Sequence, residues 1–148
     1  MTKSQIKIIA IIFVIVAALG FLDATYLTIE HYLNSIPPCT VLSGCEVVLT
    51  SGFNQILNIP VALLGSIFYL VMLIIAIACL DSRNIRTLRI GGYGSILGML
   101  ATLYFVYLQF FVIHHICIYC MTSAVTSTTL FVLGMIILFK TKKVEIEI

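Results

Sequence analysis

Four long apolar stretches restrict what this chain can fold into more than any other feature of its sequence. They cover approximately residues 6–26, 59–80, 90–113 and 116–139. Each is close to the roughly 20 residues that a helix needs to cross the hydrocarbon core of a bilayer. None alternates between polar and apolar positions, as the shorter strands of a membrane barrel do. The sequence therefore predicts an all-α integral membrane protein, a single domain over residues 1–148 in which four transmembrane helices form a bundle.

The composition supports this prediction. Of the 148 residues, 61% are hydrophobic and only 9% are charged, whereas a soluble domain carries about 25% charged residues. The net charge of +2 is not gathered into the basic surface with which proteins bind nucleic acid. We therefore expect a lipid bilayer around the protein and no nucleic acid as a partner.

The first apolar stretch has one alternative interpretation, a cleaved signal peptide. Lys3 and Lys7 precede it, and residues 17–20 are small or apolar, as near a cleavage site. The apolar run nevertheless continues to Tyr26, which is longer than the signal-peptide core of about 7–15 residues. We therefore interpret this stretch as a membrane span.

The positions of the cations predict the orientation of the spans. All eight lie before the first stretch, between the second and third, or after the fourth: Lys3, Lys7, Arg83, Arg86, Arg89, Lys140, Lys142 and Lys143. Because cations in short flanking loops resist translocation, both termini and the middle loop are expected in the cytoplasm. The loop of about residues 31–58 and the turn at His114 and His115 then face the outside or an organelle lumen.

The predicted outer loop contains a cysteine pair and a short amphipathic segment. Pro37 and Pro38 interrupt any helix, and Cys39 follows them directly. Cys45 comes six positions later. Over residues 46–56 apolar side chains are mixed with polar ones, which favours a short amphipathic helix on the membrane surface.

Four of the five cysteines are expected on the oxidising face: Cys39, Cys45, Cys117 and Cys120. Cys79 lies near the cytoplasmic end of the second stretch, where we expect a small buried apolar residue. Disulfides persist outside the cytosol, so one interpretation is a pair of structural disulfides in a non-enzymatic tetraspan scaffold.

The CxxC pair at the start of the fourth stretch favours redox chemistry instead. A thiol at a helix start feels the positive end of the helix dipole, which lowers its pKa from a free value of about 8.5, and only the thiolate attacks a disulfide. Cys117 and Cys120 also close too short a loop to stabilise the fold much. A four-thiol zinc site beside His114 and His115 is a further alternative, although we expect no metal because the Cys39 to Cys45 spacing is longer than in common zinc sites.

The order and spacing of these residues resemble the vitamin K epoxide reductase family over nearly the whole chain. A C-x5-C pair lies in the first outer loop, a serine follows six residues after its second cysteine, and a CxxC begins the fourth span. The matching residues are Cys39, Cys45, Ser51, Gly65, Phe68, Tyr69 and the run LQFFVIHHICIYC at 108–120.

The resemblance implies a quinone-dependent thiol–disulfide oxidoreductase that supports disulfide bond formation. Cys39 would exchange disulfides with a thioredoxin-like (DsbA-type) partner, and Cys45 would then attack Cys117. Cys120, as the thiolate, would face a quinone of the menaquinone, ubiquinone or vitamin K type. Because the chain ends at Ile148 without a thioredoxin domain, the partner is expected to be a separate protein at the outer face of a prokaryotic plasma membrane.

The same resemblance suggests residues near the quinone. Ser51 matches a family serine near the redox centre, and Phe68 matches an aromatic residue of the quinone pocket. Phe110 and Phe111, near the outer end of the third stretch, either line this pocket or belong to an aromatic belt at the membrane interface.

Two positions depart from the vertebrate enzymes, which hydrogen-bond the vitamin through an asparagine and a tyrosine. Here the matching residues are Val61, four before Gly65, and Ala124, four after Cys120. Neither side chain can donate a hydrogen bond, so the sequence favours quinone reduction over epoxide reduction.

Two further features are expected to serve the architecture. Asp23 lies toward the outer end of the first stretch, where we expect an interfacial, solvated carboxylate. Gly94 and Gly98 have the spacing that lets membrane helices approach closely, and we expect them to pack within the bundle. No stretch is broken in its middle by Gly or Pro, which argues against a transporter.

Overall fold

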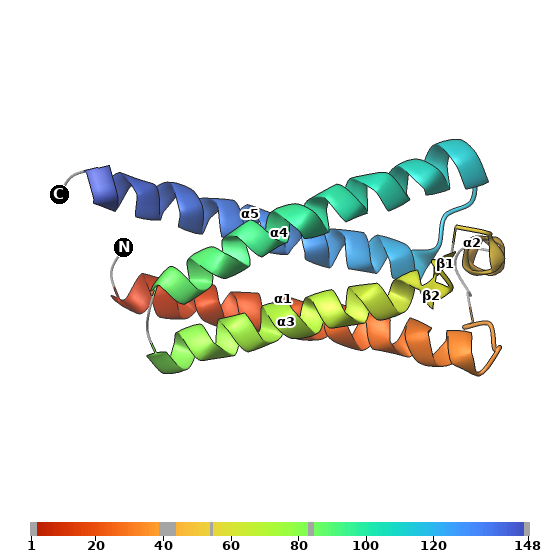
Figure 1. Cartoon of the computed structure of the whole chain (residues 1–148), viewed down its shortest axis with the longest axis horizontal. Helices are drawn as coiled ribbons and strands as arrows, with labels where there is room; N and C mark the ends of the chain where they lie inside the picture. Colours follow the sequence, from red (N-terminus) through yellow and green to blue (C-terminus); the bar gives the residue numbers. More distant parts are fainter. Residues whose placement is uncertain (1–2, 39–43, 54, 83–84, 147–148) are drawn as a thin grey trace.

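The computed structural model describes residues 3–38, 44–53, 55–82 and 85–146 as a bundle of long helices (Figure 1). Among these residues, four helices are long and apolar enough to cross a membrane, as the sequence predicts. They are α1 (Lys3–Tyr32), α3 (Val61–Ser82), α4 (Ile85–Tyr107) and α5 (Ile118–Ile146). The π-helix η1 (Leu108–Ile113) continues α4. The all-α four-helix membrane architecture is therefore confirmed.

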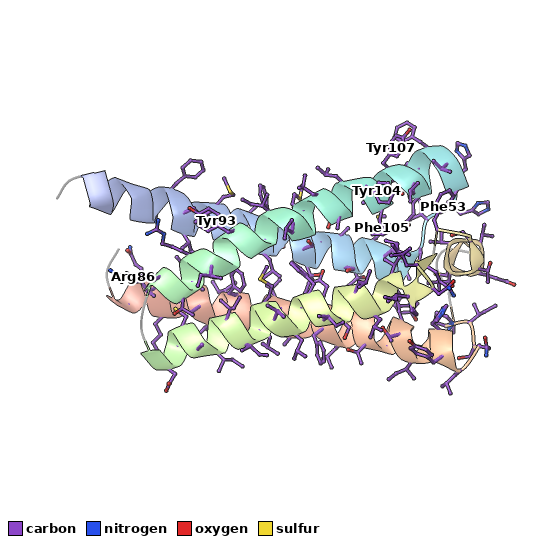
Figure 2. The ribbon with its side chains drawn as sticks, viewed as in Figure 1. Phe53, Arg86, Tyr93, Tyr104, Phe105 and Tyr107 are labelled. Carbon is purple, nitrogen blue, oxygen red and sulfur yellow. The ribbon has the colours of Figure 1, made fainter. Side chains whose placement is uncertain are left out.

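The helices pack in an order that brings distant parts of the chain together. Helix α1 packs along α3, α4 packs along α5, and α1 also contacts α5. Figure 1 shows the start of α1, the end of α3, the start of α4 and the end of α5 at one end of the bundle, and the turn between η1 and α5 at the other. Arg86 lies at the end that holds the termini (Figure 2). The cation-rich segments thus share one end, which is the arrangement that the charge pattern predicts.

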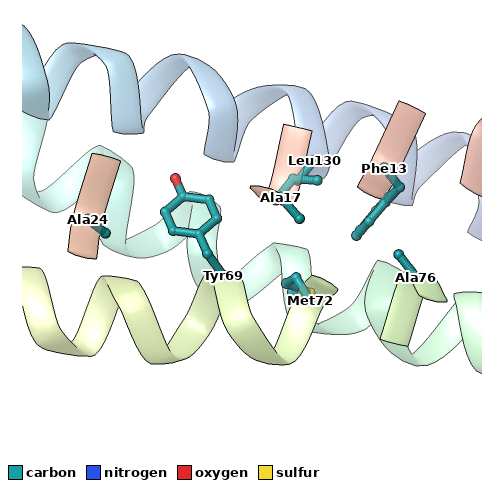
Figure 3. Close-up of a cluster of buried hydrophobic side chains, with 7 residues drawn as sticks. All are labelled: Phe13, Ala17, Ala24, Tyr69, Met72, Ala76 and Leu130. Carbon is teal, nitrogen blue, oxygen red and sulfur yellow. The ribbon is translucent and has the colours of Figure 1, made fainter. Parts of the chain in front are cut away.

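The centre of the bundle is a cluster of buried side chains from three helices (Figure 3). Its members are Phe13, Ala17, Ala24, Tyr69, Met72, Ala76 and Leu130. The Tyr69 hydroxyl points from α3 toward α5, where it lies 2.7 Å from the carbonyl oxygen of Ser123 and 2.8 Å from Oγ1 of Thr126. A buried hydroxyl needs such partners, so these bonds hold α3 and α5 in one rotational setting.

Close helix contact at Gly94 and Gly98 confirms that these glycines pack within the bundle. A Cβ on Gly94 would lie 2.7 Å from the terminal methyl of Met72, and a Cβ on Gly98 would overlap the Phe68 ring. A larger residue at Gly98 would displace the Phe68 ring, and one at Gly94 would displace the end of the Met72 side chain.

The end of the bundle opposite the termini carries three short elements. They are helix α2 (Cys45–Thr50) and the antiparallel strands β1 (Gln55–Ile56) and β2 (Ile59–Pro60). The predicted amphipathic helix is therefore real but shorter than residues 46–56. The helix ends at Thr50 because the next residue, Ser51, has an extended backbone. The Ser51 hydroxyl donates a 2.7 Å hydrogen bond to the Val48 carbonyl.

Candidate redox site

Three of the four predicted redox cysteines lie together at the end of the bundle opposite the termini. Cys45, Cys117 and Val48 form a buried cluster, and Cys120 packs against it. Cys45 is disulfide-bonded, whereas Cys117 and Cys120 are free thiols. Cys39, the fourth predicted residue, lies outside the described residues. Helix α2 and the start of α5 thus place one loop cysteine beside the CxxC pair.

Gly44 allows this close approach between distant segments. A Cβ on Gly44 would lie 2.8 Å from the carbonyl oxygen of Ile116 and 2.9 Å from its nitrogen. Such contacts with backbone atoms cannot be relieved by a side-chain movement, so only glycine fits without displacing α2. The neighbouring Cys45 reaches Cys117 because residue 44 has no side chain.

The environment of Cys117 favours its thiolate. A hydrogen bond with the Cys120 thiol is the largest influence and lowers the pKa of Cys117 to about 7. Burial opposes this effect, while the N–H groups of Cys120 and Tyr119 add to it. These N–H groups belong to the first turn of α5, where no helical carbonyl is available to them. The sequence assigned the stabilised thiolate to Cys120, but the structure favours it at Cys117, because Cys117 precedes the helix and receives those donors.

Gln109 is a site residue that the sequence pattern did not identify. Its side-chain oxygen accepts a 3.0 Å hydrogen bond from the N–H of Cys117, and the residue is only 3% exposed. It lies in η1, where the helix widens before the turn at His114, whose φ is 56°. An amide side chain within an apolar membrane stretch was the signal, because such residues rarely remain without a partner.

A cavity of about 410 Å³ opens beside the CxxC pair. Cys120, Ser51 and Phe68 line it, so the structure brings two of the predicted quinone contacts together with one thiol of the CxxC. Phe110 and Phe111 are 49% and 67% exposed and are not among the described residues that line the cavity. Their outward positions match the aromatic belt that the sequence left as the alternative.

The walls of this cavity are largely apolar. Val61 and Ala124, the two positions that depart from the vertebrate enzymes, both line it. Two polar atoms stand out against that background, Oδ2 of Asp23 and Oγ of Ser127, which are buried and have no hydrogen-bond partner among the described residues. The expectation of a solvated carboxylate at Asp23 is therefore wrong, since packing of α1 against the other helices turns Asp23 inward.

The described residues contain no group of three or more His, Cys, Asp or Glu side chains that could hold a metal ion. His114 and His115 are exposed, and Nδ1 of His115 lies 2.9 Å from the carbonyl oxygen of Ile113. Cys79 is 1% exposed and belongs to a separate apolar cluster with Ala10, Leu88 and Ile137.

Two free thiols packed against a disulfide-bonded cysteine can exchange one disulfide for another, and the bundle carries them at one end of four membrane-spanning helices. The protein is a membrane thiol–disulfide oxidoreductase. Residues 11–135 match the sequence profile of the vitamin K epoxide reductase family, and the chain belongs to that family.

Proposed function

We propose that the protein carries electrons from a thioredoxin-like dithiol at the outer face of the membrane to a quinone in the bilayer. The observation that carries this proposal is the burial of Cys45 and Cys117 in one cluster, with Cys120 facing the apolar cavity. The four cysteines then act in the order Cys39, Cys45, Cys117 and Cys120.

The relay begins with the loop pair. The partner's dithiol reduces a Cys39–Cys45 disulfide and is itself oxidised, which supports disulfide formation in the partner's own substrates. The freed Cys45 thiolate attacks Cys117 of the oxidised CxxC, and the sulfur of Cys120 leaves as thiolate. Cys39 then attacks Cys45, which re-forms the loop disulfide and leaves a reduced CxxC. Because Cys117 is 0% exposed, a soluble partner has no direct access to it, so a shuttle through the loop is needed.

The second half of the reaction takes place at the cavity. Closing the Cys117–Cys120 disulfide releases two electrons and two protons, which convert a quinone to the quinol. A thiolate at Cys117, whose pKa is about 7, is the nucleophile that closes this bond onto Cys120. The cavity fits a quinone ring because its walls are apolar and include the aromatic ring of Phe68. Oδ2 of Asp23 and Oγ of Ser127 have no hydrogen-bond partner among the described residues and can bind the polar atoms of a ligand.

Quinone reduction suits this cavity better than epoxide reduction. The vertebrate enzymes that the sequence resembles hold the vitamin by side-chain hydrogen bonds at two positions, and Val61 and Ala124 supply none at those positions. We expect purified protein with a dithiol to reduce a quinone much faster than the corresponding epoxide. Comparable rates for the two substrates would contradict this preference.

The proposed orientation places the redox end outside a prokaryotic plasma membrane and both termini in the cytoplasm. It rests on the cation-rich segments, which gather at the opposite end of the bundle from Cys45 and Cys117 (Figure 1). The partner is a separate thioredoxin-like protein that meets the relay at Cys39. The quinone is of the menaquinone, ubiquinone or vitamin K type.

Replacement of single cysteines tests the proposal. Cys120→Ala should abolish quinone reduction by a reduced thioredoxin-like protein, while the loop pair still exchanges once with that protein. Cys79→Ala is the control, because Cys79 is also a free cysteine but lies in another cluster, and it should keep full activity. Full quinone reduction by Cys120→Ala would refute the assigned role of Cys120, whereas a wild-type protein that reduces no quinone would favour the scaffold with structural disulfides.

A further inference from the structure

Two buried side-chain oxygens in the described part of the molecule have no hydrogen-bond partner, and both belong to residues that line the cavity. Oδ2 of Asp23 comes from α1 and Oγ of Ser127 from α5, and both residues line the cavity beside Cys120. Buried polar atoms are nearly always hydrogen-bonded in native proteins, so such exceptions call for an explanation. A ligand with its own polar atoms, seated between these two helices, would supply the missing partners.

Asp23 differs from the other polar groups around the cavity in being free to move a proton. The Tyr69 hydroxyl is held by Ser123 and Thr126, and the side-chain oxygen of Gln109 is held by the Cys117 N–H. Among the described lining residues, the remaining titratable groups are Asp23 and the thiol of Cys120. The carboxyl is therefore the group that can accept a proton from one partner and donate it to another.

The carboxyl also interacts with the redox pair electrically. The charge of Asp23 acts on both Cys117 and Cys120, and it raises the pKa of Cys117 against the hydrogen bonds that lower it. Repulsion disfavours the state in which Asp23 and Cys117 are both ionised. Asp23 is therefore protonated when Cys117 is a thiolate. A protonated carboxyl can act as an acid.

Asp23 also lies well inside the bundle. It lies nine positions before Tyr32 at the end of α1, which is about 14 Å along a helix. The surroundings at that depth are apolar, including Ala24 and Phe68. A proton needed there is best carried by a side chain already in place.

We propose that Asp23 transfers a proton to the quinone oxygen and is then reloaded by the thiol of Cys120, an inference that rests on the proposed quinone reduction. As the dithiol gives up its electron pair, the carboxyl donates its proton to one oxygen. The Cys120 sulfur joins Cys117 and loses its proton to Asp23. The second quinone oxygen takes a proton from solution. This proton balances the one that Cys117 released to solution when it formed its thiolate. Two electrons and two protons reach the quinone, and Asp23 ends as it began.

Three substitutions test this role with a short-chain quinone and a reduced thioredoxin-like protein. Asp23→Asn keeps the shape but cannot carry a proton, so kcat should fall by about 100-fold or more, as for loss of a general acid. The KM for the quinone should change by less than about threefold, since the amide still fills the site. Asp23→Glu should recover part of kcat. Asp81→Asn, an exposed acid at the end of α3, is the matched control and should behave as the wild type.

A rescue experiment separates proton transfer from a structural role. Asp23→Ala should regain activity as formate is added, because a small acid can enter the space left by the side chain, and chloride at the same concentration should have no effect. A normal kcat in Asp23→Asn, or a loss that neither glutamate nor formate recovers, would overturn the inference while the wild type still reduces quinone. A wild-type protein that cannot reduce quinone at all would instead refute the proposed function.

Discussion

The main-chain N–H of Cys117 donates a 3.0 Å hydrogen bond to the side-chain oxygen of Gln109, eight residues earlier. This bond crosses the turn between η1 and α5, so it fixes the position of the nucleophilic cysteine from the neighbouring helix. The Cys117 nitrogen lies before the first turn of α5 and has no helical acceptor. The buried N–H of Cys117 is therefore satisfied by the Gln109 side chain that accepts its hydrogen bond.

Gln109→Leu should therefore destabilise the protein by about 1–3 kcal/mol, the penalty for one buried unsatisfied donor. Thermal unfolding in detergent measures the change, and the rate of Cys45–Cys117 exchange should fall as Cys117 shifts. Gln55→Leu, at an exposed position in β1, is the control and should change stability by less than about 0.5 kcal/mol. Equal stability of the two variants would show that water replaces the lost acceptor.

Cys39→Ala should trap the relay between its two halves. Without Cys39 nothing resolves the mixed disulfide, so a Cys45–Cys117 bond should accumulate and close a long loop. The bond is detected by a mobility shift on non-reducing gels and mapped by mass spectrometry of peptides. If Cys45→Ala instead accumulates a Cys39–Cys117 bond, the roles of the two loop cysteines are reversed, although the relay survives.

The reactivity of Cys117 should follow a titration near neutral pH. Its pKa of about 7 lies below the free value of about 8.5, so the thiolate fraction, and the alkylation rate with a small reagent, should rise through a midpoint near pH 7. Cys120→Ala removes the largest stabilising hydrogen bond, and the midpoint should then move upward. Both proteins carry Cys79→Ala to remove background labelling. An unchanged midpoint in the double variant would assign the lowered pKa to the helix N–H groups alone.

Membrane-impermeant thiol labelling in intact cells should report the orientation of the bundle. After reduction, the reagent should modify Cys39 from outside but not the buried Cys45 or Cys79, which are 0% and 1% exposed, and Cys79 lies in the cluster toward the cation-rich end. Labelling of Cys79 from outside would invert the topology, and the proposed exchange with an external partner would then fail.

The sequence by itself determined the features that depend on one segment at a time. A run of about 20 apolar residues crosses a bilayer because of its own composition, and cations flanking the runs mark one end of the bundle. The CxxC pattern likewise indicated reactive thiols at a helix start, and the mixture of apolar and polar side chains after Cys45 indicated a short amphipathic element there. These properties need no knowledge of what the segment packs against.

Only the tertiary structure decided which side of each helix faces inward. In a membrane helix the lipid-facing and core-facing sides are both apolar, so the usual amphipathic signal for rotation is missing. For this reason the sequence could not place Asp23 inside the cavity or Phe110 and Phe111 outside it. Contact between Gly44 and Ile116, far apart in the chain, brings Cys45 to Cys117. Rotation and long-range contact are set by packing among all four helices, and no single stretch of sequence contains them.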